Sequence, residues 1–158
     1  MIVRMAAPND AASIVSLVRE LADYEHALHE VQMSSEDLTR VLFDEDPHVF
    51  CHVVESEGSI VAMALWFLTF STWTGTTGLY LEDLYVQEAF RGRGLGKLLM
   101  HTLAALCVQR GFVRFEWSVL DWNTPSIDFY RSIGAHPLDE WTRFRLSGDE
   151  LREFGVAS

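Results

Sequence analysis

The feature that most constrains this chain is a glycine-rich turn between a strand-like run and a helix-like run. The turn reads Arg91-Gly92-Arg93-Gly94-Leu95-Gly96-Lys97. Glycine lets the backbone come close to a ligand, and the free N–H groups at the start of a helix attract anions. The turn can therefore hold a pyrophosphate without a metal ion. The plainer alternative is a flexible turn with solvated arginines, which three alternating glycines between two regular elements make less favoured.

Two common nucleotide-binding patterns do not fit this turn. A P-loop needs Ser or Thr after its lysine, whereas Leu98 follows Lys97 here. The dinucleotide-binding fingerprint spaces its glycines as G-x-G-x-x-G, and this turn spaces them as G-x-G-x-G. The sequence thus argues against an ATPase and against a Rossmann-type dinucleotide site.

Regular elements follow one another in an order that predicts a mixed α/β sheet covered by helices. Alternating or β-branched apolar residues predict strands, and apolar residues three and four apart predict helices. Two helices are expected to begin near Asp10 and Ser34, and two more to end near Gly111 and Gly134. No linker or repeat interrupts the 158 residues, so we expect a single domain over 1–158. The predicted strands are 2–5, 49–55, 59–67, 79–86, 112–119 and 141–146.

Composition excludes some classes of function. Twelve basic and 23 acidic residues give a net charge of -11, the wrong sign for a protein that binds nucleic-acid phosphates. No apolar run is long enough to span a membrane, and the first ten residues lack the pattern of a signal peptide, so we expect a cytoplasmic protein. Cys51 and Cys107 are too few for a disulfide framework, which favours two buried or unremarkable thiols.

Two segments of the sequence resemble a known family. The stretch from Val86 to Gly96 is similar to the acetyl-CoA signature of the GNAT N-acetyltransferases, R/Q-x-x-G-x-G/A. The stretch from Asn123 to Tyr130 is similar to the family's second cofactor-facing segment. The likeness covers nearly the whole chain and is closest to the diamine acetyltransferases, which comprise spermidine/spermine and thialysine acetyltransferases. The runs 80–83 and 20–25 carry that narrower match.

The resemblance implies the GNAT acyl-CoA N-acyltransferase fold and acetyl-CoA as the cosubstrate. It also implies that the strand before the glycine turn separates from its neighbour, which leaves backbone amides near 84–86 for the pantetheine and the acetyl carbonyl. One such N–H group would stabilise the oxyanion of the tetrahedral intermediate. The residues that the resemblance places at the cofactor are Leu84, Tyr85, Val86, Arg91, Gly92, Arg93, Gly94, Leu95, Gly96, Lys97, Asn123, Thr124, Pro125, Ser126 and Tyr130.

The resemblance also supplies two catalytic candidates. A free amine must lose a proton before it attacks, because alkylamines have pKa values near 10, and Glu82 is the matching base. Tyr130 is the matching donor of a proton to the departing thiolate. Tyr130 also has a purely structural alternative. Its helical spacing from Ile127 is typical of a residue that packs in the core. In a regular strand Glu82 and Asp83 would point to opposite faces, and a bulge would relax that constraint.

Five residues are similar to those that bind the cationic substrate in the diamine acetyltransferases: Tyr24, Glu25, Trp73, Glu82 and Asp83. Carboxylates and an indole face attract ammonium groups, although a solvated acidic loop and a packed tryptophan are the alternatives. By an ungapped count from Trp73, Ser71 stands where the spermidine/spermine enzymes carry an acidic residue. This favours a lysine-like amine such as thialysine over a polyamine.

Some alternatives stay open at this point. A protein or peptide N-acetyltransferase and a non-catalytic acyl-CoA-binding module are the rival functions. His26 and His29 have a spacing that could suit a metal, but no third ligand is placed with them, so we expect no metal. By resemblance the protein is expected to be a homodimer, with no nucleic acid and no membrane as partners.

Overall fold

The computed structural model describes residues 1–156. The chain divides into two compact units, Met1–Ser118 and the residues from Val119 onward, and each is described by itself. The expectation of a single domain over 1–158 stays a prediction.

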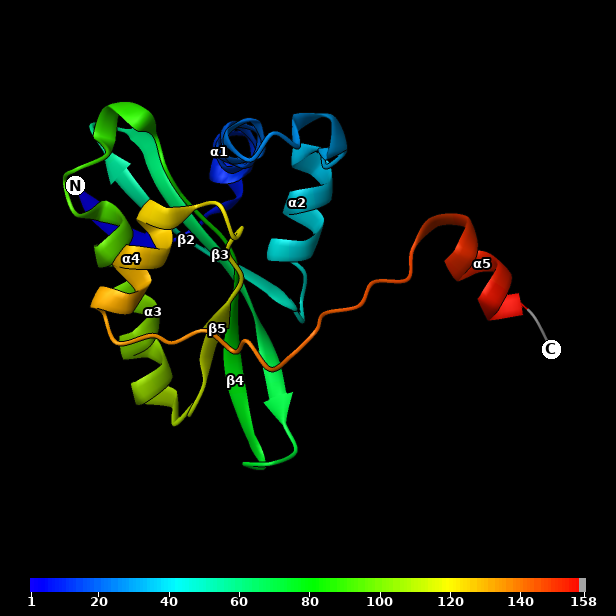
Figure 1. The fold of residues 1–158 in the computed structure, drawn as a ribbon. Coiled ribbons are helices and arrows are strands. Elements are labelled where there is room, and N and C mark those ends of the chain that lie inside the picture. Colours follow the sequence, from blue (N-terminus) through cyan, green and yellow to red (C-terminus); the bar gives the residue numbers. More distant parts are fainter. Residues whose placement is uncertain (157–158) are drawn as a thin grey trace. The chain divides into compact units, whose positions relative to one another are not determined.

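A five-stranded sheet forms the centre of the first unit (Figure 1). The strands lie in sequence order: β1 (Ile2–Met5), β2 (Val49–Ser56), β3 (Ser59–Ser71), β4 (Thr76–Val86) and β5 (Phe115–Trp117). The first four are antiparallel, whereas β5 is parallel to β4. A parallel neighbour requires a crossover, and a long helix between β4 and β5 supplies it. The mixed sheet with helices agrees with the α/β class that the sequence predicts.

Helices cover both faces of this sheet (Figure 1). Helices α1 (Ala11–Tyr24) and α2 (Ser35–Leu42) bury Ile14, Leu17 and Leu38 against Met63 and other strand residues. Alternate strand residues point to opposite faces, and α3 (Leu95–Arg110) buries its own apolar stripe against the second face. Three short 3₁₀ helices complete the unit: Pro8–Asp10, Leu28–Glu30 and Glu88–Phe90.

Local sequence signals explain where several of these elements begin and turn. Ser34 accepts a hydrogen bond from the Asp37 backbone at 3.1 Å, and the Asp37 carboxylate accepts one from the Ser34 backbone at 3.1 Å. This capping box begins α2 at Ser34, where the sequence predicts the start of a helix. The predicted strands 49–55 and 59–67 form β2 and β3, and the turn between them has Glu57 and Gly58 both at positive φ, which suits a tight hairpin. Both thiols are buried, as the sequence favours.

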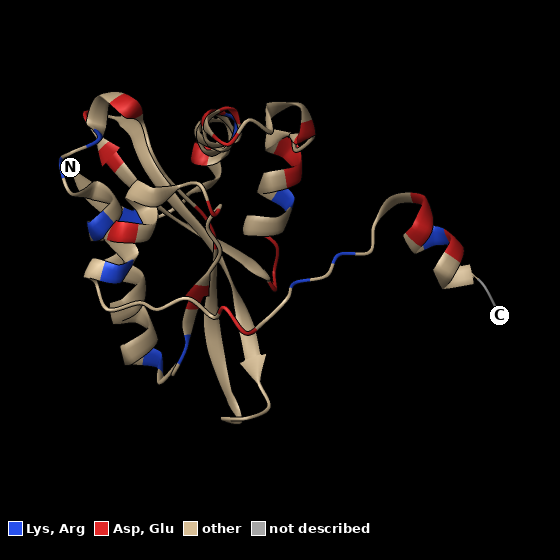
Figure 2. Cartoon of the chain, in the orientation of Figure 1, with Lys and Arg blue, Asp and Glu red and all other residues tan. Residues whose placement is uncertain are grey.

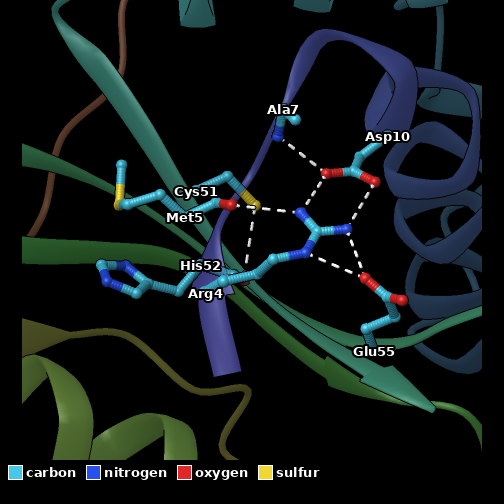
Figure 3. A network of polar contacts seen from close by, with 7 residues as sticks. All are labelled: Arg4, Met5, Ala7, Asp10, Cys51, His52 and Glu55. Atoms are coloured by element: carbon cyan, nitrogen blue, oxygen red, sulfur yellow. Dashed lines mark hydrogen bonds and ion pairs between the residues drawn. The ribbon is translucent and has the colours of Figure 1, made fainter. Parts of the chain in front are cut away.

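An arginine holds two carboxylates at the edge of the sheet (Figure 3). Arg4 donates from Nη1 to Asp10 Oδ2 at 2.6 Å and from Nε to Glu55 Oε2 at 2.9 Å. Asp10 also accepts a hydrogen bond from the Ala7 backbone at 2.7 Å. The hydrogen bonds to Arg4 hold the pKa of Asp10 below its usual value. This paired cluster therefore ties β1 to β2 and to the start of α1.

The second unit contains two helices, α4 (Thr124–Ser132) and α5 (Gly148–Val156). The prediction of a strand over 141–146 is wrong, because residues 135–147 form no helix or strand in the structure. Aromatic and apolar residues in this segment favour a strand, but a strand also needs a hydrogen-bonded neighbour, and none of residues 1–156 pairs with this segment as a ladder. The sequence reasoning also missed α5, although Ser147 and Glu150 have the spacing of a capping box.

Candidate active site

The glycine turn leaves the N-terminus of α3 without a capping side chain. Gly94 precedes the helix in the left-handed conformation, φ 77°, and no side chain caps the helix. The first backbone bond runs from the Leu98 N–H to the Gly94 carbonyl at 2.9 Å. The N–H groups of Leu95, Gly96 and Lys97 precede that bond, so they have no acceptor within the helix. A Cβ at Gly92 or Gly94 would meet no atom within 4 Å, so there is room for a ligand beside this backbone.

Three basic side chains accompany these N–H groups: Arg91, Arg93 and Lys97. Figure 2 shows basic residues at the turn and at the start of α3. Arg93 donates to the Ala89 carbonyl at 3.3 Å and lies 4.9 Å from the centroid of the Phe90 ring. Backbone donors, a helix N-terminus and nearby cations are the donor set that a pyrophosphate requires. The turn therefore fits the phosphate end of coenzyme A.

Strands β4 and β5 part beside the turn. Their parallel pairing covers only Leu79 to Leu81 of β4 and ends at the Leu81–Trp117 pair. Leu84, Tyr85 and Val86 continue to pair with β3 on the other side. Beyond Leu81, β4 has no ladder partner on the β5 side among residues 1–156. This is the separation that the resemblance implies, and it leaves a backbone edge leading from the acidic residues to the turn.

A bulge in β4 sets the directions of Glu82 and Asp83. Leu65 pairs with Asp83 and Trp66 pairs with Leu81, so Glu82 is the extra residue between them. Glu82 is exposed, while Asp83 is partly buried. Because the bulge removes the strict alternation of a strand, both carboxylates can serve one site.

The carboxylates of Glu25, Glu82 and Asp83 form an acidic group that has no cationic partner among residues 1–156. Burial raises the pKa of Asp83 to about 6, and the negative charges of Glu82 and Glu25 add to the effect. Burial also raises the pKa of Glu25. Within residues 1–156, no ion pair or side-chain hydrogen bond reaches these three carboxylates. An ammonium group would supply the missing positive charge.

Arg91 connects the glycine turn to the end of α1. Its Cζ atom lies 5.3 Å from the centroid of the Tyr24 ring and 5.4 Å from that of the Tyr85 ring. It donates from Nε to the Val86 carbonyl at 3.1 Å and from Nη2 to Tyr85 Oη at 3.3 Å. Sequence reasoning placed Arg91 and Tyr85 at the cofactor but missed this contact with Tyr24, because it joins residues far apart in the chain.

A second polar contact joins the same two regions. Gln87 Nε2 donates to Glu20 Oε1 at 3.1 Å, which links the exit of β4 to α1. Sequence reasoning gave no role to Gln87 or to the Glu20 carboxylate, since no motif marks a pair 67 positions apart.

Trp73 lies apart from the acidic group in this chain. It sits in the turn between β3 and β4, where its side chain is 81% exposed. The ladder from the Leu65–Asp83 pair to the Ser71–Thr76 pair covers six steps of β3, or about 20 Å at 3.3 Å per residue. The structure thus brings together Tyr24, Glu25, Glu82 and Asp83 near one end of the sheet but does not bring Trp73 to them.

The remaining candidates lie together in the second unit, at α4. Asn123 precedes the helix, and its Oδ1 accepts a hydrogen bond from the Ser126 backbone at 3.4 Å. Thr124 and Pro125 open the helix, where proline costs no hydrogen bond. Tyr130 lies on the same helix, with its ring centroid 5.5 Å from that of Phe129.

Two further features concern metal ions and membranes. Within residues 1–156, no three His, Cys, Asp or Glu side chains gather in a way that could hold a metal ion. The same residues include no helix long and apolar enough to cross a membrane.

Comparison with known proteins gives the family. Residues 14–135 match the model of the acetyltransferase (GNAT) family, which is more than half of the chain. The chain belongs to the GNAT acetyltransferase family. It is therefore an enzyme that transfers acetyl groups, and acetyl-CoA is the cosubstrate that GNAT enzymes generally use.

Curated relatives of this GNAT enzyme act on amines. The mouse thialysine N-epsilon-acetyltransferase is 36% identical over 96% of this chain and 95% of its own length. The Caenorhabditis elegans protein of the same name is 33% identical over 93% of this chain and 92% of its own. A human spermidine/spermine N(1)-acetyltransferase-like protein is 32% identical over 94% of this chain, which corresponds to 23% of that longer protein.

Solved structures agree on the fold. An integron cassette protein from V. cholerae aligns with a TM-score of 0.82 at 24% identity, covering 99% of this chain and 98% of that one. An aminoglycoside acetyltransferase from a soil metagenome aligns with a TM-score of 0.78 at 20% identity, covering 94% of this chain and 96% of that one. At these identities the likeness concerns the fold alone, and it agrees with the GNAT fold that the sequence resemblance implies.

Proposed function

We propose that this enzyme transfers an acetyl group from acetyl-CoA to a primary amine of a small cationic substrate. The observation that carries the proposal is the acidic group of Glu25, Glu82 and Asp83, which lies without a cation at the bulge of β4. The same strand leads to the glycine turn through the short 3₁₀ helix Glu88–Phe90. An ammonium group and a phosphate-bearing cosubstrate would therefore meet along one strand.

Acetyl-CoA would be held mainly by the turn and by the separated edge of β4. The N–H groups at 95–97 and the side chains of Arg91, Arg93 and Lys97 would bind its pyrophosphate. The backbone at 84–86 would contact the pantetheine and the acetyl carbonyl. In the second unit, Asn123, Thr124, Pro125, Ser126 and Tyr130 are proposed to complete the cofactor site by resemblance.

The reaction would proceed by direct attack in a ternary complex. Glu82 removes a proton from the ammonium group, directly or through water, and the neutral nitrogen forms a bond to the acetyl carbon. A backbone N–H group near 84–86 stabilises the negative carbonyl oxygen. When the carbon–sulfur bond breaks, Tyr130 donates a proton to the departing thiolate, and the amide nitrogen returns its extra proton to the tyrosinate, directly or through water. No metal is needed for any of these steps.

A lysine-like amine such as thialysine is the substrate we favour, with a diamine or polyamine as the alternative. The names of the mouse and C. elegans relatives point to thialysine. Ser71 also lacks the charge that a long polyamine would use there. Asp83 and Glu25 would hold the ammonium, and Tyr24 would offer its ring to the cation.

The test is release of free coenzyme A from acetyl-CoA with a panel of thialysine, lysine, spermidine, short diamines and peptides. Turnover with one small amine, and a product heavier by one acetyl group, would support the proposal. Turnover with peptides alone would overturn the small-amine assignment. If acetyl-CoA binds and no amine is acetylated, the acetyl-acceptor site has been wrongly placed.

The enzyme is proposed to be a cytoplasmic homodimer that uses neither a nucleic acid nor a membrane as a partner. Large apolar side chains of the segment 138–146 are exposed in the single chain, Phe144 at 90%. Such an exposed apolar segment suits an interface with a second copy of the chain. Light scattering should give twice the chain mass, and a monomer would contradict the proposal.

A further inference from the structure

The contacts of Arg91 carry an inference that rests on the proposed function and goes beyond it. Arg91 belongs to the turn that fits a pyrophosphate, yet its guanidinium lies between two tyrosine rings, Tyr24 at 5.3 Å and Tyr85 at 5.4 Å. Tyr24 is the last residue of α1, and Glu25 follows it directly. Tyr85 lies two residues after Asp83 on β4. One side chain therefore touches both the cofactor turn and the two elements that carry the acidic group.

The guanidinium has donors left for an anion. Arginine has five N–H donors. Within the described chain, Nε donates to the Val86 carbonyl and Nη2 to Tyr85 Oη, while Nη1 makes no hydrogen bond. Arg91 can therefore bind a phosphate oxygen without leaving the tyrosines. A bound phosphate would fix the guanidinium and, through the ring contact, the end of α1.

We propose that Arg91 is a positioning residue that couples the two substrates, so that coenzyme A in the turn raises the affinity of the site for the amine. Tyr24 is an exposed residue at a helix end, where the chain frays most easily. If coenzyme A has already ordered the end of α1, the binding of the amine no longer carries the entropic cost of that ordering. The coupling is reciprocal, so the amine raises the affinity for coenzyme A by the same factor.

The experiment measures the dissociation constant of thialysine by calorimetry with and without saturating coenzyme A. If the panel selects spermidine, spermidine takes its place. We expect coenzyme A to tighten amine binding about fivefold in the wild-type enzyme, at the low end of typical couplings. In Arg91→Gln the ratio should fall to about 1, measured at a coenzyme A concentration that saturates the variant. Arg91→Lys keeps a cation over the rings and should retain part of the coupling.

Arg93→Gln is the matched control, because it removes one positive charge from the same turn. Arg93 contacts the Phe90 ring and donates a hydrogen bond to the Ala89 carbonyl, whereas Arg91 is the arginine over the Tyr24 ring. It should weaken coenzyme A binding yet keep the fivefold ratio. Tyr24→Leu removes the ring and should abolish the ratio while coenzyme A still binds.

The ratio separates this inference from the proposed function. If the wild-type enzyme binds both ligands and turns over, but Arg91→Gln has the same ratio as the wild type, the coupling role is wrong and the function stands. An equal loss of the ratio in Arg93→Gln would likewise overturn it, since charge alone would then explain the effect. If thialysine and spermidine both fail to bind to the coenzyme A complex, the proposed function itself fails.

Discussion

Two groups of carboxylates in the first unit have opposite surroundings. Asp10 and Glu55 share the guanidinium of Arg4, and the pKa of Asp10 is held low by those hydrogen bonds (Figure 3). Glu25, Glu82 and Asp83 have no cation within the described chain, and the pKa of Asp83 is raised to about 6. The paired group stabilises the fold, whereas the negative charges of the unpaired group repel one another.

The difference indicates what each group is for. A carboxylate that the chain already pairs has little to offer an external cation. Unpaired carboxylates lower the stability of the folded chain because they repel one another. A cationic substrate can supply the positive charge that would offset this repulsion. Substitutions in the two groups should therefore have opposite effects on stability and unequal effects on catalysis.

The largest effect is expected for Glu82→Gln in the unpaired group. Loss of a general base typically costs two or more orders of magnitude, so kcat should fall about 100-fold at pH 8. The fold should be unaffected, because Glu82 is exposed and makes no ion pair in the described chain. Steady-state kinetics over pH 6 to 10 measures this, and an unchanged pH profile would remove Glu82 from the mechanism.

Arg4→Ala should turn the paired group into an unpaired one. Removing the cation leaves Asp10, which is nearly buried, and Glu55 without their partner. The free energy of unfolding should fall by roughly 2 kcal/mol at pH 7, as measured by urea denaturation. Arg40→Ala is the control, since Arg40 pairs with Asp37 at the surface and its loss should cost under about 1 kcal/mol. Equal losses in the two variants would contradict the special role of Arg4.

Asp83→Asn should stabilise the folded chain while it weakens the site. Because the folded pKa of about 6 exceeds the reference value of 3.8, ionisation of Asp83 increasingly opposes folding as the pH rises from about 4 to about 6, and the full cost is present above that range. The variant should gain about 3 kcal/mol at pH 8, and the gain should disappear below about pH 4, where the carboxyl becomes protonated in both states. Urea denaturation at both pH values tests this, and a loss of stability at pH 8 would show that Asp83 is a structural residue.

The smallest effect concerns pH and the amine. Above about pH 6 Asp83 is ionised and attracts the ammonium group, and below that value it is neutral. The KM for the amine should therefore rise about threefold between pH 7.5 and pH 5.5, because one charge near the surface is worth roughly 1 kcal/mol and roughly a quarter of Asp83 stays ionised at pH 5.5. The KM for acetyl-CoA serves as the internal control. A parallel rise in both constants would point to a general loss of structure.

Local signals in the sequence predicted much of the first unit. The capping box at Ser34, the tight turn at Glu57 and Gly58, and the open start of α3 at Gly94 each depend on residues close in the chain. The fold class and the family also follow from such signals, because the glycine turn and its flanking elements are contiguous.

Features that depend on distant residues could not be predicted. The strand expected over 141–146 failed because periodicity says nothing about an available ladder partner. The bulge at Glu82 is defined by its register with Leu65 and Trp66, and the Arg91 contact by the end of α1. The resemblance grouped Trp73 with Asp83, and only the strand register shows how far apart they lie in one chain.

The measurement that tests the account most directly compares kcat/KM for thialysine between the wild-type enzyme, Asp83→Asn and the control Asp23→Asn at pH 8. Asp23 is an exposed carboxylate near the end of α1 and is not part of the acidic group. We expect turnover by the wild type, a loss of at least about tenfold in Asp83→Asn and little change in Asp23→Asn. Equal kcat/KM values in all three proteins would contradict the claim that the unpaired carboxylates form the amine site.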